Sequence, residues 1–270
     1  MKKYKVFEML KRSQNLKYRL AINSLIVGIL VGLTIVAHRI IISKLSPIFL
    51  NIYKNGRHNF IIVPLIFLTL IALGYIVGKC LKKQPMISGS GIPQVEGILT
   101  RNLKINWFSV LFYKFVGGLI CLCAGLSVGR EGPSVQMGAC IGEGVSKNLK
   151  NLDNEEKYLI TSGASAGLSA AFNAPLSGVM FALEEAHKNI STLVLTTAMI
   201  ASISADFVSK QFFGLIPSLD FRKVEPLPLK NYWTLIILGI IIGISGVIFN
   251  KGILKTQSLF KKSKLSIEIK

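Results

Sequence analysis

Charged side chains are scarce in this sequence, and acidic ones are the scarcest. Asp and Glu together number 13 against 32 Lys and Arg, and charged residues make up only 17% of the 270 residues. Hydrophobic residues make up 51%, and the mean hydropathy of +0.53 lies well above that of a soluble domain. The composition therefore predicts an integral membrane protein that crosses the lipid bilayer several times.

The excess of positive charge has two possible meanings. A formal net charge of +19 would suit a nucleic-acid-binding protein. The basic residues, however, cluster at the edges of apolar stretches, as the cytoplasmic flanks of membrane spans do, so no nucleic acid partner is expected. Basic residues also crowd the region before the first apolar run, which lacks an evident small-residue cleavage site. The N-terminus is therefore expected in the cytoplasm and the protein in the plasma membrane.

Residues that commonly hold metals or carry out covalent chemistry are few. The four cysteines form no CxxC pair, and Cys121 and Cys123 fit small-residue packing in a helix better than a ligand pair. His38, His58 and His187 fall at the ends of apolar segments or in loops, so each is expected at the membrane interface. Neither a metal site nor a catalytic centre is predicted, and a membrane-embedded enzyme is disfavoured.

Apolar segments of two lengths divide the chain. The longer ones predict membrane-spanning helices at 20–37, 60–78, 107–126, 191–208 and 232–249. The segments between them are too short or too rich in glycine for ordinary spans, and they predict half-helices at 87–100, 129–145 and 161–183. GASAGLSAAFNAPLSG, residues 163–178, is crowded with Gly, Ala and Ser, which let helix backbones pack closely against neighbours rather than against lipid.

Three places put small residues directly before a proline, namely GSGIP at 89–93, GREGP at 129–133 and NAP at 173–175. Proline suits the first turn of a helix, where its missing N–H leaves nothing unpaired, and glycine allows a tight backbone before it. Each place therefore predicts a helix that begins inside the protein. Because helix N-termini carry unpaired N–H groups and about half a positive charge, these starts predict a site for a small anion.

Arg130 and Glu131 stand side by side at the second of these helix starts. The Glu131 carboxylate stands where an anion belongs, so it can act as a gate that leaves when it is protonated or displaced. The residues alone leave open the alternative that Glu131 caps the helix and pairs with Arg130. Ser90 offers a hydroxyl donor at the first helix start, and Arg130 raises the local positive potential.

From about residue 20 to residue 255 the chain resembles the CLC family of chloride channels and proton/chloride antiporters. GSGIPQVEG is similar to the family's first anion-binding signature, GREGPSVQMG to its second, and AAFNAPLSGVMFALEE to the stretch that leads to its internal glutamate. The three motifs follow the family's order at similar spacing. The resemblance implies an all-α integral membrane fold of many helices, some of them broken or half-length.

The resemblance also implies a set of site residues. Its anion-binding members are Gly89, Ser90, Gly91, Ile92, Pro93, Arg130, Glu131 and Gly132. Within this set the Ser90 hydroxyl coordinates the central chloride, and Glu131 is the external gate. Glu185 is implied to be the internal proton-transfer residue, and Lys114 to give supporting electrostatics. Without the family, Glu184 and Glu185 favour a solvated helix end, and Lys114 favours snorkelling or an ion pair.

The function implied is proton-coupled chloride exchange, because antiporters of the family carry a glutamate at the position of Glu185 and its channels typically replace it. A passive, voltage-gated type of chloride channel is the alternative within transport. A non-transporting half-protein or scaffold that needs a partner chain is the alternative outside it. Chloride and protons are the transported species, and no cofactor is expected.

Family members consist of two inverted halves, and this chain resembles the first half plus the first helix of the second. No segment resembles the family's later GxFxP loop or the later tyrosine that faces Ser90, so an incomplete transporter is expected. The expected regions are a basic N-terminal segment 1–19, a first repeat 20–210, a connecting loop 211–230, a first helix of the second repeat 231–255, and a basic tail or truncation point 256–270. The full-length protein is expected to be a homodimer.

Overall fold

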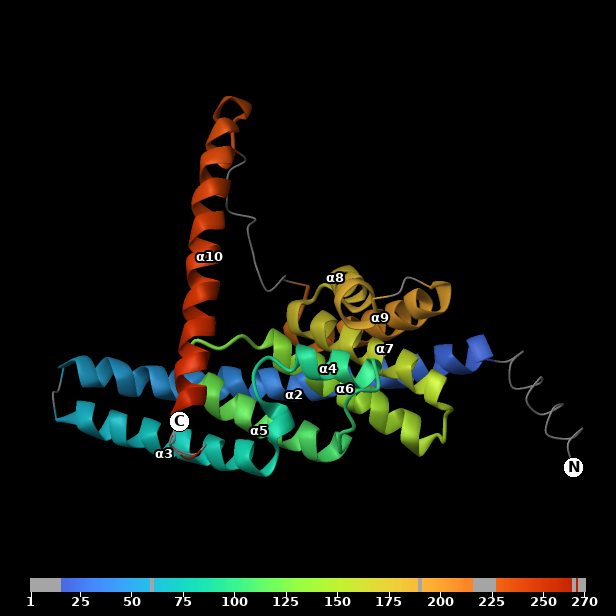
Figure 1. The fold of residues 1–270 in the computed structure, drawn as a ribbon, viewed down its shortest axis with the longest axis horizontal. Coiled ribbons are helices and arrows are strands. Elements are labelled where there is room, and N and C mark those ends of the chain that lie inside the picture. The colour runs from blue at the N-terminus through green and yellow to red at the C-terminus, as the bar shows by residue number, and fades with distance from the viewer. Residues whose placement is uncertain (1–15, 59–60, 189–190, 216–226, 264–265, 267–270) are drawn as a thin grey trace, which may run out of the picture.

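The fold of the described residues is entirely helical (Figure 1). The structure is a computed structural model, and it describes residues 16–58, 61–188, 191–215, 227–263 and 266. Its elements in chain order are α2 (Leu16–His58), α3 (Ile62–Lys83), η1 (Pro85–Ile87), α4 (Ile92–Leu99), α5 (Trp107–Cys123), α6 (Glu131–Asn148), α7 (Asp153–Phe172), α8 (Pro175–Phe181), η2 (Ala182–His187), α9 (Thr192–Phe213), η3 (Leu229–Asn231) and α10 (Trp233–Lys262). The prediction of an all-α fold with half-helices is confirmed.

The centre of the fold is the pair α6 and α7, whose backbones lie in direct contact. A Cβ atom built on Gly138 would collide with the carbonyl oxygen of Gly163, and one built on Gly163 would collide with that of Gly138. A Cβ atom on Gly142 would collide in the same way with the carbonyl oxygen of Leu159. Glycine therefore allows this approach, and the prediction that the small residues of 163–178 pack against protein is confirmed for α7, whose alanines and serines are buried.

The first apolar helix is much longer than the predicted span 20–37. It runs without interruption for 43 residues, with Pro47 inside it. The polar pair His38 and Arg39 does not end the helix, because both side chains pack against or bind to residues of other helices. His38 is 1% exposed and packs edge-to-face on Phe115 of α5, with ring centroids 5.0 Å apart. His38 therefore packs inside the helix bundle, and its position at the membrane interface stays a prediction.

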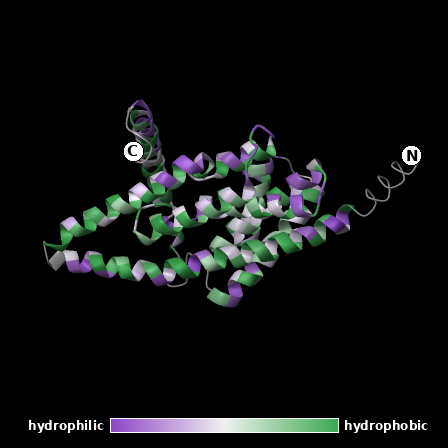
Figure 2. Cartoon of the chain, turned by 90° about the horizontal axis from the view of Figure 1, so that it is seen from below, coloured by the Kyte–Doolittle hydropathy of each residue, from purple (hydrophilic) through white to green (hydrophobic). Residues whose placement is uncertain are grey.

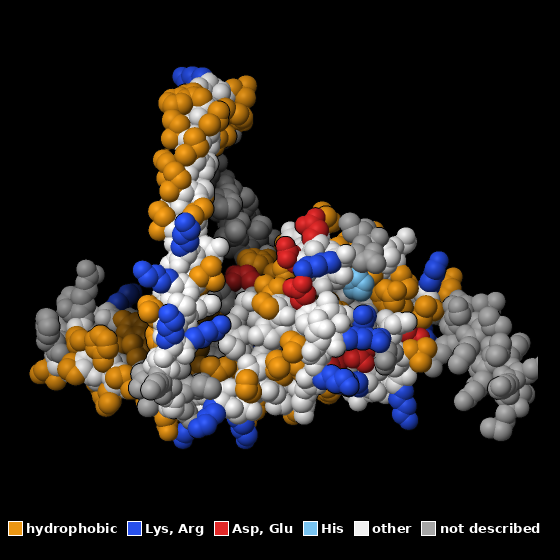
Figure 3. Space-filling view, viewed as in Figure 1, with side chains coloured by type: hydrophobic (Ala, Val, Ile, Leu, Met, Phe, Trp, Pro, Cys, Tyr) orange, Lys and Arg blue, Asp and Glu red, His pale blue; other side chains and the backbone are white. Residues whose placement is uncertain are grey.

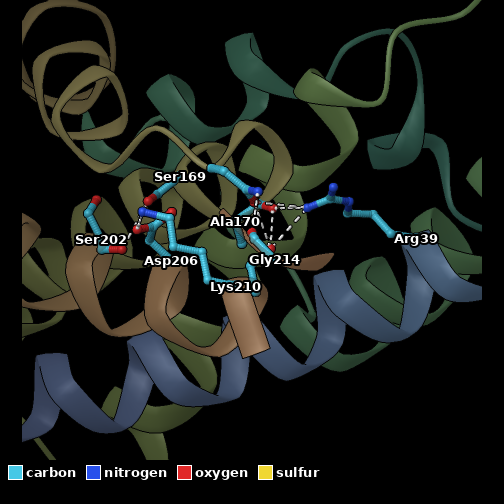
Figure 4. Close-up of polar contacts among 9 residues, drawn as sticks. Arg39, Ser169, Ala170, Ser202, Asp206, Lys210 and Gly214 are labelled. Atoms are coloured by element: carbon cyan, nitrogen blue, oxygen red, sulfur yellow. Dashed lines mark hydrogen bonds and ion pairs between the residues drawn. The ribbon is translucent and has the colours of Figure 1, made fainter. Parts of the chain in front are cut away.

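Arg39 joins α2 to the ends of α7 and α9 (Figure 4). Its Nη1 donates hydrogen bonds to the carbonyl oxygen of Ala170 at 2.8 Å and to the hydroxyl of Ser209 at 2.9 Å. Its guanidinium also lies 3.9 Å from the ring centroid of Phe213. These contacts give the charge polar partners inside the helix bundle, which is why α2 continues past Arg39.

The third predicted half-helix, 161–183, is divided in the structure. α7 ends at Phe172, Asn173 follows in the left-handed conformation with φ of 57°, and α8 begins at Pro175. After α8 the chain continues as the short π-helix η2. The helix start predicted from NAP is therefore confirmed, but most of the small residues before it belong to α7.

Among the described residues, four helices are long and apolar enough to cross a membrane: α2, α3, α9 and the segment that contains α10. α5 is a shorter apolar helix of 17 residues. Apolar residues run along the outer helices (Figure 2), and the predicted spans near 60–78, 107–126, 191–208 and 232–249 are all helical. The predicted loop 211–230 and tail 256–270 lie partly outside the described residues.

α3 and α10 present most of their surface to the outside. Gly78 is the buried residue of α3, and α10 has no buried residue along its 30 positions. α10 stands away from the helix bundle, and apolar side chains cover its upper part in Figure 3. Lipid or another polypeptide is therefore required to cover these two helices in a membrane protein.

Candidate functional site

One cavity brings the two predicted anion-binding motifs together. It has a volume of about 680 Å³, and it is lined by the Gly89–Ser90 loop before α4, by Lys114 on α5, and by Glu131 and Gly132 at the start of α6. Ile92 at the start of α4 also lines it. Gly91 and Arg130 precede α4 and α6, and Pro93 lies in the first turn of α4, but none of the three lines the cavity.

The Ser90 loop is a tight turn that leads into α4. Gly89 and Gly91 have φ values of 65° and 94°, a region that favours glycine. The backbone N–H of Ile92 donates to the Ser90 hydroxyl oxygen at 3.3 Å. Because a hydroxyl accepts and donates at the same time, this bond leaves the O–H of Ser90 free to donate to an anion.

Lys114 of α5 fixes this loop through hydrogen bonds to its backbone. Its side chain is buried, at 5% exposure for the residue, and Nζ donates to the carbonyl oxygens of Ile87 at 2.9 Å and Gly89 at 2.8 Å. The ammonium group therefore neither snorkels to a membrane surface nor rests on a carboxylate. It places a positive charge at the cavity wall and occupies the two carbonyl oxygens with hydrogen bonds.

Glu131 is the first residue of α6, and its half-buried side chain lines the cavity. Its carboxylate folds back over Gly129, since a Cβ atom there would collide with Oε2. Within the described part of the chain, Glu131 forms no ion pair with Arg130. The proposed pairing of these two residues is therefore wrong, and Arg130 occupies the N-cap position without a side-chain cap.

The two loops meet at Gly132 and Ser90. A Cβ atom on Gly132 would lie 2.6 Å from the carbonyl oxygen of Ser90 and 2.9 Å from its Cβ atom. The N-termini of α4 and α6 are thereby held at one cavity, as the sequence predicts. The third helix start, at α8, does not line this cavity. Asn173, just before it, instead accepts a hydrogen bond from Arg39 at 3.2 Å.

Glu185 lies apart from the cavity. It is exposed on η2, next to Glu184, which is also exposed. Close to it, Lys188 forms an ion pair with Glu96 of α4, and the hydrogen bond with Glu96 raises the pKa of Lys188. η2 packs against α4, so Glu185 and the Ser90 loop are connected through one short helix.

Sequence reasoning missed part of the cavity wall. Beyond Lys114, the wall of α5 includes Gly117, Gly118 and Cys121, which follow Lys114 at intervals of three, four and seven residues. This is the spacing of one helix face, so the helical period identifies them once Lys114 is placed at the cavity. Residues of α3 also line the cavity, and no local pattern marks them.

The polar groups that line the cavity are mostly hydrogen-bond donors and positive charge, the groups that suit an anion. The cavity offers a hydroxyl, a buried ammonium group and helix N-termini, and its one lining carboxylate belongs to Glu131. Among the described residues, no group of three or more His, Cys, Asp or Glu is arranged to hold a metal ion.

The sequence is similar to a known family of membrane transport proteins. The family model described as voltage gated chloride channel matches residues 70–270. The H(+)/Cl(−) exchange transporters ClcA of Salmonella paratyphi B and Salmonella newport are each 36% identical to the chain over 243 residues. Each match covers 88% of this chain and 51% of the relative, so the chain spans about half the length of these relatives.

Solved structures show the same architecture. A slow cyanobacterial Cl−/H+ antiporter matches with a TM-score of 0.83 and 29% identity, covering 91% of this chain and 59% of that one. A CLC-type fluoride/proton antiporter matches with a TM-score of 0.70 and 25% identity, covering 91% and 60%. A eukaryotic CLC transporter, at 22% identity and a TM-score of 0.72, shares the fold. On its sequence and its fold, the chain belongs to the CLC family of voltage-gated chloride channels and proton/chloride antiporters.

Proposed function

We propose that this chain forms the anion-binding half of a proton-coupled chloride exchanger. The observation that carries the proposal is the single cavity that joins the Ser90 loop, Lys114 and Glu131. The relatives at 36% identity are named H(+)/Cl(−) exchange transporters, which supports exchange over passive conduction. Chloride and protons are the proposed substrates.

The proposed chloride position lies between the N-termini of α4 and α6. A dehydrated anion there receives the Ser90 O–H, the N–H groups of the two helix starts, and the field of the buried Lys114 ammonium group. The Glu131 carboxylate is also an anion and lines the same cavity. Chloride and ionised Glu131 therefore compete for one region of positive potential, and protonation of Glu131 favours chloride.

Glu185 is proposed as the internal proton donor and acceptor. Its exposed position on η2 lets it exchange protons with water. It lies three positions before Lys188, which pairs with Glu96 of α4. With the basic N-terminal segment in the cytoplasm of a plasma-membrane protein, Glu131 is proposed to gate the outer side of the pathway. Glu185 is proposed to exchange protons with the cytoplasm.

The exposed surfaces of α3 and α10 support the proposal that further polypeptide completes the transporter. An anion at the cavity receives donors from one side only, and chloride dehydration requires several of them. A second half is proposed to supply the rest, in the same chain or in another, and the complete protein is proposed to be a homodimer.

Chloride efflux from proteoliposomes, recorded together with external pH, tests this function. The 270-residue chain is reconstituted alone and with the later half of Salmonella paratyphi B ClcA, and that later half alone is the control. We expect coupled proton and chloride movement in at least one of the two preparations that contain this chain. Chloride movement without protons would establish a channel instead, and absence of flux from both would contradict the function.

A further inference from the structure

The backbone before Ser90 is held by side chains at four consecutive carbonyl groups. Lys114 binds the carbonyl oxygens of Ile87 and Gly89. Gln94 Nε2 donates to the carbonyl oxygen of Ser88 at 2.8 Å, and Gln136 Nε2 donates to that of Met86 at 2.8 Å. We name residues 86–91 the anion loop. The carbonyl oxygens of residues 86–89 in this loop are thus occupied by side-chain donors.

Gln136 differs from the other two donors in its position. Gln94 belongs to α4, the helix that the anion loop itself begins, whereas Gln136 belongs to α6, the helix that begins with Glu131. Gln136 is 0% exposed. Its amide oxygen, Oε1, accepts no hydrogen bond from the described residues. A buried side chain with this single hydrogen bond is poorly explained by general helix stability.

Gln136 also touches the other end of the anion loop. A Cβ atom built on Gly91 would lie 2.7 Å from Cβ and from Cδ of Gln136. The side chain therefore binds the first residue of the loop and packs against the last. Five residues separate it from Glu131, about 7.5 Å along one rigid helix.

We propose that Gln136 is a positioning residue that fixes the anion loop relative to Glu131. This inference rests on the proposed function. Its physical basis is the Met86 carbonyl, which lies against α6 and loses its side-chain donor when Gln136 is replaced. The loop then moves away from α6. As a result, the N–H groups of the two helix starts and the hydroxyl of Ser90 no longer point to the same anion position. Anion affinity falls as a result, while the maximum rate of transport changes little.

The test uses Gln136→Met, which keeps the length of the side chain and removes its hydrogen bond. Gln211→Met is the matched control, because Gln211 is exposed on α9, far from the loop in sequence and outside the cavity lining. Hydrogen–deuterium exchange of the chain in lipid nanodiscs measures directly how well the backbone amides of the anion loop are protected. The chloride concentration at half-maximal flux is measured in the preparation that transports.

We expect faster exchange in residues 86–91 of Gln136→Met, unchanged exchange in α7, and a half-maximal chloride concentration raised about fivefold, the effect of one net hydrogen bond. Gln136→Leu, a shorter apolar side chain that also lacks the donor, should give the same result. Unchanged loop exchange would overturn the inference, and so would faster exchange with unaltered chloride dependence. A wild-type preparation without flux contradicts the proposed function instead, and the exchange measurement then still decides whether Gln136 holds the loop.

Discussion

Gly132 lies so close to Ser90 that a Cβ atom on Gly132 would come within 2.6 Å of the Ser90 carbonyl oxygen. This contact joins the first turn of α6 to the loop before α4, and the two predicted anion-binding motifs become one site through it. The distance between the proposed gate, Glu131, and the proposed chloride ligand, Ser90, is therefore set by a glycine.

Gly132→Ala should separate the two loops. The methyl group meets backbone atoms that cannot rotate away, so we expect a loss of about 1–3 kcal/mol in the free energy of unfolding and weaker chloride binding. Gly117→Ala is the control, because Gly117 lines the same cavity but a Cβ atom there has no heavy atom within 4 Å. Thermal unfolding and chloride-dependent flux measure the effect, and equal behaviour of the two variants would refute the close approach.

Glu131→Ala should uncouple proton movement from chloride movement while chloride flux continues. The carboxylate is proposed both to occupy the anion region and to carry the proton, and alanine does neither. Chloride efflux with simultaneous pH recording measures the coupling. Glu131→Gln separates charge from size, and it should behave as alanine does for protons. Retained proton coupling in both variants would remove Glu131 from the mechanism.

Glu185→Gln should abolish proton coupling and spare chloride flux. Glu185 is exposed on η2 and lies outside the cavity, so its loss leaves the anion site intact. Glu184→Gln is the matched control, because Glu184 is the preceding residue on the same short helix and is also exposed. Chloride efflux with simultaneous recording of external pH measures both variants. If Glu184→Gln uncouples the transporter and Glu185→Gln does not, the proposed assignment is reversed.

Lys114→Met should lower thermal stability and weaken chloride binding together. The substitution leaves the carbonyl oxygens of Ile87 and Gly89 without a side-chain donor, and each buried unpaired group costs about 1–3 kcal/mol. It also removes a positive charge from the cavity wall. Lys79→Met, at an exposed position of α3, is the control, and circular dichroism follows the unfolding. A variant with wild-type stability would show that Lys114 acts through its charge alone.

Gly142→Ala should destabilise the contact between α6 and α7. Its Cβ atom would collide with the carbonyl oxygen of Leu159, so the two helices must move apart, at a cost of about 1–3 kcal/mol. Gly239→Ala on α10 is the control, since a Cβ atom there meets no heavy atom within 4 Å. The unfolding midpoint in detergent is the measurement, and equal midpoints would contradict the backbone contact.

Much of the architecture follows from local signals in the sequence. Pro93, Pro133 and Pro175, each with small residues before it, mark the starts of α4, α6 and α8, because the chemistry of a helix start involves only neighbouring residues. The apolar runs mark the long helices for the same reason. The extent of α2 could not be predicted in this way. The charge of Arg39 suggests that the apolar helix ends before it, and only its partners on α7 and α9 explain why the helix continues.

The sequence by itself determined that the chain is a helical membrane protein, where its broken helices begin, and which of its motifs resemble the anion-binding signatures of the family. Only the tertiary structure decided that the loops of Ser90 and Glu131 share a cavity while the start of α8 does not. It also decided that Lys114 binds loop carbonyls rather than an acidic partner, and that Gln136 binds a carbonyl of the same loop. The reason is physical: helix starts depend on neighbours in the chain, whereas a shared cavity depends on the close approach of distant backbones, which glycines permit but do not direct.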